Sequence, residues 1–266
     1  MTDVSQEDPH PPALRSLVRR VLAIRESGLV EPAVQRFLDE GLAGEVVESL
    51  RHLMTDIDGE GFREAYHGIV TKLAEPGRVA YSRVGELYRA AYGAGYVPVR
   101  YLLLNPPPRL VARPDEVLPD LELLDIPLGR RKAMARGQNR DALVRLLLDP
   151  HPHIVEIILD NPKVIERDLV SMAARRPTLG AVLLKVAAHP RWSIRYEVQR
   201  ALVLNPYSPP AVAVSYLPFL RSNHLLEVGS DARLHESVRE SARGVEQWRF
   251  ERRARTLPVP SGSERH

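Results

Sequence analysis

Three residues in one short stretch have the types that bind a metal ion. Asp149, His151 and His153 lie in the sequence DPHPH, and histidine with a carboxylate suits zinc or iron. Pro152 separates the two imidazoles, however, and no second group of ligands accompanies them. A polar turn between two helices explains the same residues, and we favour that interpretation. A metal-dependent enzyme at His151 and His153 is therefore the weakest of three functional hypotheses.

Clustered basic residues give a stronger indication of a binding surface. Five cations fall within eleven residues and two more arginines flank Trp192; these candidate partner-binding residues are Arg130, Arg131, Lys132, Arg136, Arg140, Arg191 and Arg195. Such cations can meet phosphates, an acidic protein surface or a membrane surface, or they can form a solvated helix face. No aromatic residue interleaves with the cluster at 130–140, as it does in surfaces that stack bases. We therefore favour an acidic protein partner over nucleic acid.

The composition also argues against a dedicated nucleic-acid binder and against catalysis. The formal net charge is only +3 over 266 residues. There is no cysteine, which excludes disulfides, thiolate metal sites and cysteine nucleophiles. Phosphate-loop, dinucleotide-binding, zinc-protease and serine-hydrolase motifs are all missing from the sequence. We expect a protein that is not an enzyme and that needs no cofactor.

Aromatic residues leave two alternatives open. Five of the nine tyrosines lie between residues 81 and 101, and these are Tyr81, Tyr88, Tyr92, Tyr96 and Tyr101. Tyrosine is common at protein interfaces, but a core seam between the N-terminal unit and the repeat array explains the group as well, and we prefer the seam. Trp192 is either an exposed anchor or a plug between helices, and we prefer the plug.

Short helices ended by proline surround the DPHPH stretch and Trp192. Between residues 142 and 220 an apolar run is repeatedly followed by a small or polar residue and a proline, in LLLDP, ILDNP, AARRP, VAAHP and LVLNP. Proline lacks an amide donor and clashes with the preceding turn, so each proline ends a helix. Alternate prolines lie 27, 28 and 29 residues apart, which predicts a repeating two-helix unit.

These segments resemble a known class of helical repeat. LGRRKAMARGQNRDALVRLLLDPHPHIVEIILDNP, and ERDLVSMAARRP with VAAHPRWSIRYEVQRALVLNP, are similar to HEAT-like and leucine-rich-repeat-variant α-solenoids. More narrowly, they resemble uncharacterised bacterial proteins of the myxobacterial kind that share these stops. The resemblance covers about residues 128–220 and implies a solenoid that holds a protein, or less often nucleic acid. The units are shorter and richer in proline than a standard HEAT pair, so the resemblance does not give the curvature.

We therefore predict an all-α fold, an α-solenoid of short Pro-terminated helices that follows a small helical unit. The expected parts are a disordered start (1–12), an N-terminal unit of about five helices (13–104), a proline-rich crossing (105–127), the repeat array (128–228), a C-terminal helix (229–256) and a disordered tail (257–266). Within the array, a helix over 179–188 should bury Leu183. The polar start lacks the pattern of a signal peptide, and no stretch has the roughly 20 apolar residues that cross a bilayer. We expect a cytoplasmic protein.

The three functional hypotheses are then ordered. The first is a non-enzymatic scaffold or adaptor that binds a protein, in bacterial signalling, polarity or envelope machinery. The alternative is a nucleic-acid-binding helical repeat protein with an arginine-lined face, and the metal-dependent enzyme comes last. Partner identity, pathway and oligomeric state do not follow from the sequence.

Overall fold

The computed structural model describes residues 10–24, 30–75 and 77–256. Within these ranges the regular structure is helical throughout, with fifteen α-helices, three 3₁₀ helices and no strand, which confirms the all-α prediction for this part of the chain. The segments predicted to be disordered are residues 1–12 and 257–266. Residues 1–9 and 257–266 lie outside the described ranges. None of the described helices is both long and apolar enough to cross a membrane.

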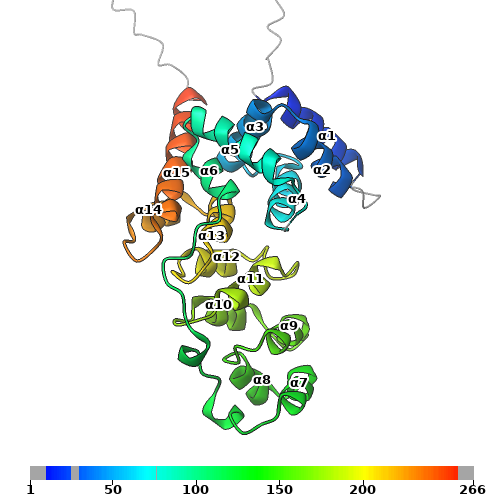
Figure 1. Ribbon diagram of the computed structural model, residues 1–266, viewed down its shortest axis with the longest axis vertical. Helices are drawn as coiled ribbons and strands as arrows, with labels where there is room; N and C mark the ends of the chain where they lie inside the picture. Colours follow the sequence, from blue (N-terminus) through cyan, green and yellow to red (C-terminus); the bar gives the residue numbers. More distant parts are fainter. Residues whose placement is uncertain (1–9, 25–29, 76, 257–266) are drawn as a thin grey trace, which may run out of the picture.

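Six helices form the N-terminal unit at the top of Figure 1: α1 (Pro12–Ile24), α2 (Val30–Glu40), α3 (Ala43–Thr55), α4 (Phe62–Ala74), α5 (Tyr81–Gly93) and α6 (Val97–Leu103). Their apolar stripes bury side chains such as Leu50, Tyr66 and Leu87 completely. The sequence predicted about five helices here, and α6 is the additional one. Pro98 lies in the first turn of α6, where a missing amide donor breaks no helical hydrogen bond.

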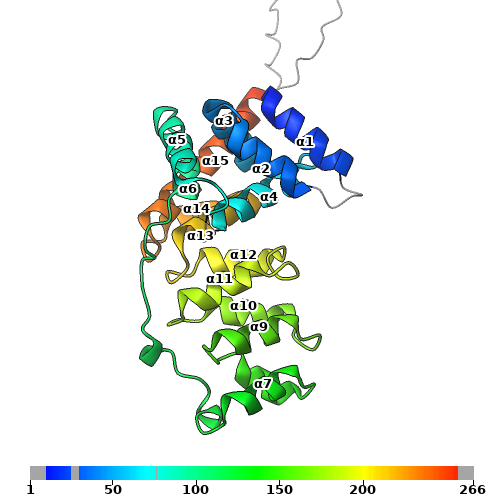
Figure 2. The same cartoon turned by 45° about the vertical axis from the view of Figure 1, so that its right-hand side comes forward.

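After α6 the chain crosses the length of the molecule without a long helix. Figures 1 and 2 show this crossing beside the helical array, with only the short helices η1 (Pro114–Glu116) and η2 (Leu121–Leu123) within it. Hydrogen bonds attach it at intervals: the Leu110 amide donates to the Pro206 carbonyl at 3.1 Å, and Arg175 Nη2 donates to the Leu118 carbonyl at 2.7 Å. The crossing therefore carries the chain to the far end of the array, from which the array returns.

The array consists of eight short helices, which alternate along the chain between two sets that we call rows. One row contains α7 (Leu128–Arg136), α9 (Pro152–Asp160), α11 (Gly180–Ala188) and α13 (Pro210–Tyr216); the other contains α8 (Arg140–Leu146), α10 (Glu166–Ala174), α12 (Tyr196–Val203) and α14 (Ser222–Ser230). Helix α9 packs against both α7 and α11, and α10 packs against α12. In Figure 1 these helices are stacked from α7 at the bottom to α13 near the N-terminal unit. Each of the five predicted proline stops follows the end of a helix within four residues. The expected bounds of the helix over 179–188, which is α11, agree with the structure to within one residue.

Buried asparagines join one helix of a row to the next. The end of a helix leaves its last carbonyls without helical donors, whether a proline follows, as after α10, or a glycine, as after α7. Asn161, at the end of α9, donates through Nδ2 to the carbonyls of Ala135 and Gly137 at the end of α7, at 2.7 and 2.9 Å. Asn205, which follows α12, donates in the same way to Ala173 and Arg175 at the end of α10, at 2.7 and 3.0 Å.

Two aromatic side chains also donate hydrogen bonds to carbonyls at helix ends. Trp192 Nε1 donates to the Leu159 carbonyl at the end of α9, and the Tyr216 hydroxyl donates to the Ala187 carbonyl at the end of α11, both at 2.8 Å. Trp192 is 2% exposed, so it plugs the space between helices and is not a surface anchor. We call these four contacts the carbonyl interlocks.

The last helix, α15 (Glu236–Thr256), attaches the top of the array to the N-terminal unit. It packs against α14, α6 and α13, and Gly244 lies so close to α6 that a Cβ there would come within 2.9 Å of the Pro98 ring. The Tyr101 hydroxyl donates to Glu240 at 3.1 Å, and the Tyr96 ring meets Trp248 edge-on. Tyr96 and Tyr101 therefore lie at a seam between the N-terminal unit and α15, which follows the predicted array and is not part of it.

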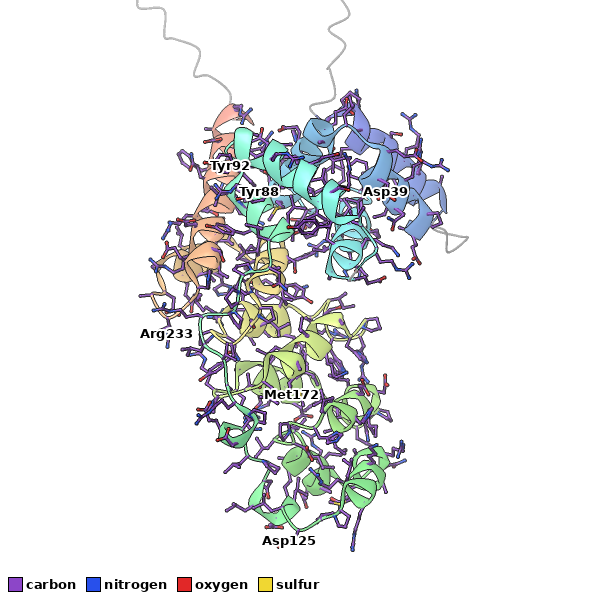
Figure 3. The ribbon with its side chains drawn as sticks, in the orientation of Figure 1. Asp39, Tyr88, Tyr92, Asp125, Met172 and Arg233 are labelled. Atoms are coloured by element: carbon purple, nitrogen blue, oxygen red, sulfur yellow. The ribbon has the colours of Figure 1, made fainter. Side chains whose placement is uncertain are left out.

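The remaining tyrosines lie on α5 and differ from one another. Tyr81 is 93% exposed and Tyr92 is 63% exposed, whereas Tyr88 is half-buried. Figure 3 shows Tyr88 and Tyr92 near the upper end of the molecule, and their rings are 6.3 Å apart. The exposure of Tyr81 and Tyr92 therefore still supports the alternative that these tyrosines belong to a protein interface.

The burial pattern of α11 predicts a large difference between two adjacent leucines. Leu183 is fully buried, so Leu183→Ala should leave a cavity and lower the free energy of unfolding by about 2–5 kcal/mol. Leu184 is 46% exposed, and Leu184→Ala should change it by only about 0.5 kcal/mol. Urea denaturation of both variants measures the difference. Equal effects would contradict the assigned inner face of α11.

The asparagine interlocks give a second prediction. Asn205→Ala removes the donor to two carbonyls and the acceptor of the Tyr207 amide, so it should destabilise the protein by about 1–3 kcal/mol. Asn223 is exposed on α14, and Asn223→Ala is the matched control, with an expected change of about 0.5 kcal/mol or less. Thermal and urea unfolding measure both variants, and a neutral Asn205→Ala would show that the interlocks contribute little.

Candidate anion-binding cleft

Two of the predicted partner-binding cations, Arg131 and Arg140, form ion pairs with buried carboxylates within the fold. Arg131 pairs through Nη1 with Asp149, whose side chain is fully buried, and Asp149 also accepts the His151 amide at 2.9 Å. Arg140 forms a two-pronged ion pair with Asp168 at the start of α10. Burial raises the pKa of Asp168, but hydrogen bonds from Arg140 and the Ile165 amide outweigh that effect and hold the pKa below its ordinary value.

The other five predicted cations fall into two separated groups. Arg130, Lys132 and Arg136 lie on α7, and their side chains form no ion pair with any residue that the structure describes. Arg191 and Arg195 are exposed in the segment before α12, where Arg191 lies over the Trp192 ring at 4.2 Å. In Figure 1 the helix α7 is at the far end of the array, whereas α12 is near its upper end, so the structure does not bring the two groups together.

The candidate metal ligands have local partners. The His151 imidazole accepts the His153 amide at 3.2 Å at the start of α9, as an N-cap residue does. The His153 ring lies 3.1 Å from a Glu156 oxygen, and Asp149 is paired with Arg131. Among the residues in the described ranges, no group of three or more His, Asp or Glu side chains is placed to hold a metal ion.

A cleft lies where the array meets the N-terminal unit. Its volume is about 620 Å³, and its walls come from the turn between α3 and α4, from the start of α12, from η3 (Leu217–Phe219) and the following turn, and from the last part of α15. The lining residues are Thr55, Asp56, Ile57, Asp58, Arg63, Tyr196, Pro218, Phe219, Leu220, Arg221, Arg249, Arg252 and Arg253. Four segments that are distant in the sequence therefore build one site.

The charge of this cleft is predominantly positive. Five arginines line it and two aspartates oppose them. Arg252 Nη2 lies 2.6 Å from Asp56, Arg63 pairs with Asp58, and Arg253 Nη2 lies 2.7 Å from Glu246, so three arginines are partly neutralised. Arg221 is exposed and has no ion pair with a described residue.

Aromatic rings hold two of the guanidinium groups from opposite walls. Arg63 lies over Phe219 at 5.6 Å, and Arg221 lies over Tyr196 at 5.1 Å. A guanidinium that stacks on a ring keeps its N–H edge free to donate, and this edge matches a carboxylate or a phosphate in two parallel hydrogen bonds. The rings thus restrict the two arginines without occupying their donors.

Buried contacts fix the floor of the cleft. Arg249 donates to the carbonyls of Leu220 and Pro218 at 2.6 and 2.5 Å, and burial lowers the pKa of its guanidinium. The Tyr196 hydroxyl lies 2.6 Å from His224 Nδ1 and also accepts the Arg221 amide at 3.2 Å. Arg249 and Tyr196 therefore position η3 and Arg221, while Arg63, Arg221, Arg252 and Arg253 present charge.

Sequence reasoning missed this site, although one local signal was present. Arg249, Arg252 and Arg253 have the spacing of neighbours on one helix face, and the overall mixture of charges along α15 concealed it. Arg63 and Arg221 come from other segments, and only the return of the array to the N-terminal unit brings them to the same cleft.

The ion pair between Arg140 and Asp168 predicts a structural effect, not a binding effect. Arg140→Ala leaves a buried carboxylate without its main partner, so it should destabilise the protein by about 1–3 kcal/mol near neutral pH. Arg136→Ala on exposed α7 is the control, with an expected change near 0.5 kcal/mol. Urea unfolding measures both.

The same variant has an expected pH dependence. Because the folded-state pKa of Asp168 is lowered, its ionised carboxylate stabilises the folded state. This stabilisation is fully present above the unfolded-state pKa of about 3.9 and is lost as the pH falls through the folded-state pKa. The difference in the free energy of unfolding between Arg140→Ala and the unmodified protein should therefore become smaller in acid. A difference that stays constant would contradict the assignment of this pair.

Comparisons with known proteins add no further information on the cleft. No family model matches the chain, and neither a curated protein nor a solved structure matches it. The function is therefore argued from the charges of the cleft and from the frame that holds them.

Proposed function

We propose that the protein is a non-enzymatic α-solenoid scaffold that binds an acidic segment of another protein in the cleft between its array and its N-terminal unit. The observation that carries this proposal is the convergence of five arginines from three segments on one open cleft. Two of them are stacked on aromatic rings, which favours donation to carboxylates over flexible exposure to water.

The solenoid assignment is supported by the repeated contacts between helices of one row. Similar interlocks at the ends of α7, α9, α10 and α11 are expected when each two-helix unit stacks on the next. A stacked frame of this kind holds a surface rigid over many residues, which suits recognition of a peptide or helix. We also propose that the protein acts in the cytoplasm, as part of bacterial signalling, polarity or envelope machinery.

The cleft favours an acidic protein segment over nucleic acid. Asp56 and Asp58 lie among the arginines, and they would repel a continuous phosphate backbone more than they would repel isolated carboxylates. The rings of Phe219 and Tyr196 already face guanidinium groups and do not form an open platform for bases. The nucleic-acid alternative would instead use α7 and the arginines near Trp192.

A labelled synthetic oligoglutamate peptide tests the proposal by fluorescence anisotropy. Arg221→Glu should weaken binding about tenfold or more, because it places a carboxylate where the peptide's carboxylates bind. Arg221→Lys should give an intermediate result, since it keeps the charge but loses the fork. Arg130→Glu, with the same change of charge at the far end of the array, should leave binding unchanged.

Other outcomes separate the alternatives. An equal loss of peptide affinity in Arg221→Glu and Arg130→Glu would show a general charge effect and would contradict binding in the cleft. Tighter binding of a single-stranded oligonucleotide that depends on α7 would support the nucleic-acid alternative. Absence of peptide binding at low ionic strength would overturn the proposal, because screening is weakest there.

A further inference from the structure

Exposed apolar side chains are concentrated in one part of the molecule. Of the sixteen large hydrophobic residues that are exposed in the described ranges, eight lie between Leu104 and Leu148. Five of them belong to the lower part of the crossing and to the α8 segment: Leu118, Leu121, Leu124, Val144 and Leu148. A group of this kind on a protein surface is typical of an interface.

Polar contacts hold these two segments side by side. Arg175 donates to the carbonyls of both Leu118 and Leu148, which brings the crossing next to the end of α8. Glu122 in η2 pairs with Arg145, one residue after Val144. These contacts place the two segments beside each other, and we call the five exposed side chains that they carry the apolar patch.

Charges of opposite sign flank this patch at the same end of the array. Helix α7 contains four cations and no acidic residue, and three of the cations, Arg130, Lys132 and Arg136, have no ion pair with a described residue. The crossing carries five acidic residues between 115 and 125; Asp115 and Glu116 pair with Arg113 and Glu122 pairs with Arg145, whereas the exposed Asp125 has no partner among the described residues. Figure 3 shows Asp125 at the lower tip, and α7 begins three residues later.

This end of the array has no covering helix. At the opposite end, α15 and the N-terminal unit pack over α13 and α14. At the far end α7 and α8 are the outermost helices, and the crossing is the neighbouring segment. The end units of stacked arrays need a polar or covered outer face, and here the face is partly apolar.

We propose that this end face, consisting of the apolar patch with Asp125 and the cations of α7, pairs with the same face of a second copy of the chain. A two-fold axis would place the acidic crossing of each copy against α7 of the other, with the leucines between them. A purely acidic partner would be repelled by the crossing, and a purely basic one by α7. A second copy satisfies both signs at once.

Charge reversal tests the pairing through mixed variants. Sedimentation equilibrium of the full chain should show a monomer–dimer equilibrium over about a hundredfold range of concentration. Arg130→Glu with Arg136→Glu should raise the dimer dissociation constant about tenfold or more, and so should Asp125→Arg. An equimolar mixture of these two proteins should associate again, because each face then meets its opposite.

A second pair of variants tests the apolar patch. Leu121→Glu places a charge on a side chain that is 77% exposed and should abolish the dimer, whereas Leu226→Glu, at a site 63% exposed on α14, should not affect it. Circular dichroism checks that all variants are folded. A strictly monomeric protein at every concentration, or dimers that survive Leu121→Glu and the charge reversals, would overturn the proposal, and so would a mixture that does not associate.

Discussion

The fold depends on how the carbonyl groups at the ends of the short helices are satisfied. Proline ends five helices of the array and Gly137 follows α7, and in each case the last carbonyls lack helical donors, which is costly where the helix end is buried. Asn161, Trp192, Asn205 and Tyr216 donate to these carbonyls from the next helix of the row. The same contacts set the spacing between repeats, because a shifted helix would lose its donor. Helices of seven to nine residues, too short to be stable alone, are thereby held in one frame.

The frame explains why a cleft exists at all. The crossing takes the chain to the far end, and the array returns to the N-terminal unit, so that η3 and α15 arrive beside the turn between α3 and α4. Arg249 donates to the carbonyls of Pro218 and Leu220 and thereby fixes η3 against α15. The other arginines of the cleft are then held at the junction of two packed bodies. Their positions follow from the topology more than from any local motif.

Sequence reasoning was successful where the signal was local. Proline stops and apolar spacing predicted α11 and the burial of Leu183, because both signals act within a few residues of the helix they define. The interlocks were not predicted, since Asn205 bonds to Ala173, 32 residues earlier in the chain. The cleft was missed for the same reason on a larger scale. Arg63 and Arg221 become neighbours only after the array has returned.

Charge shows most clearly why residue type alone is a poor guide to a binding site. Arg131 and Arg140 belong to the densest basic cluster of the sequence, yet buried carboxylates at Asp149 and Asp168 already neutralise them. An unpaired buried carboxylate is costly, so these arginines are required by the fold before any partner is considered. The small net charge of +3 then conceals two local excesses, one on α7 and one in the cleft. Binding depends on such excesses because screening confines each charge to its surroundings, within about 10 Å.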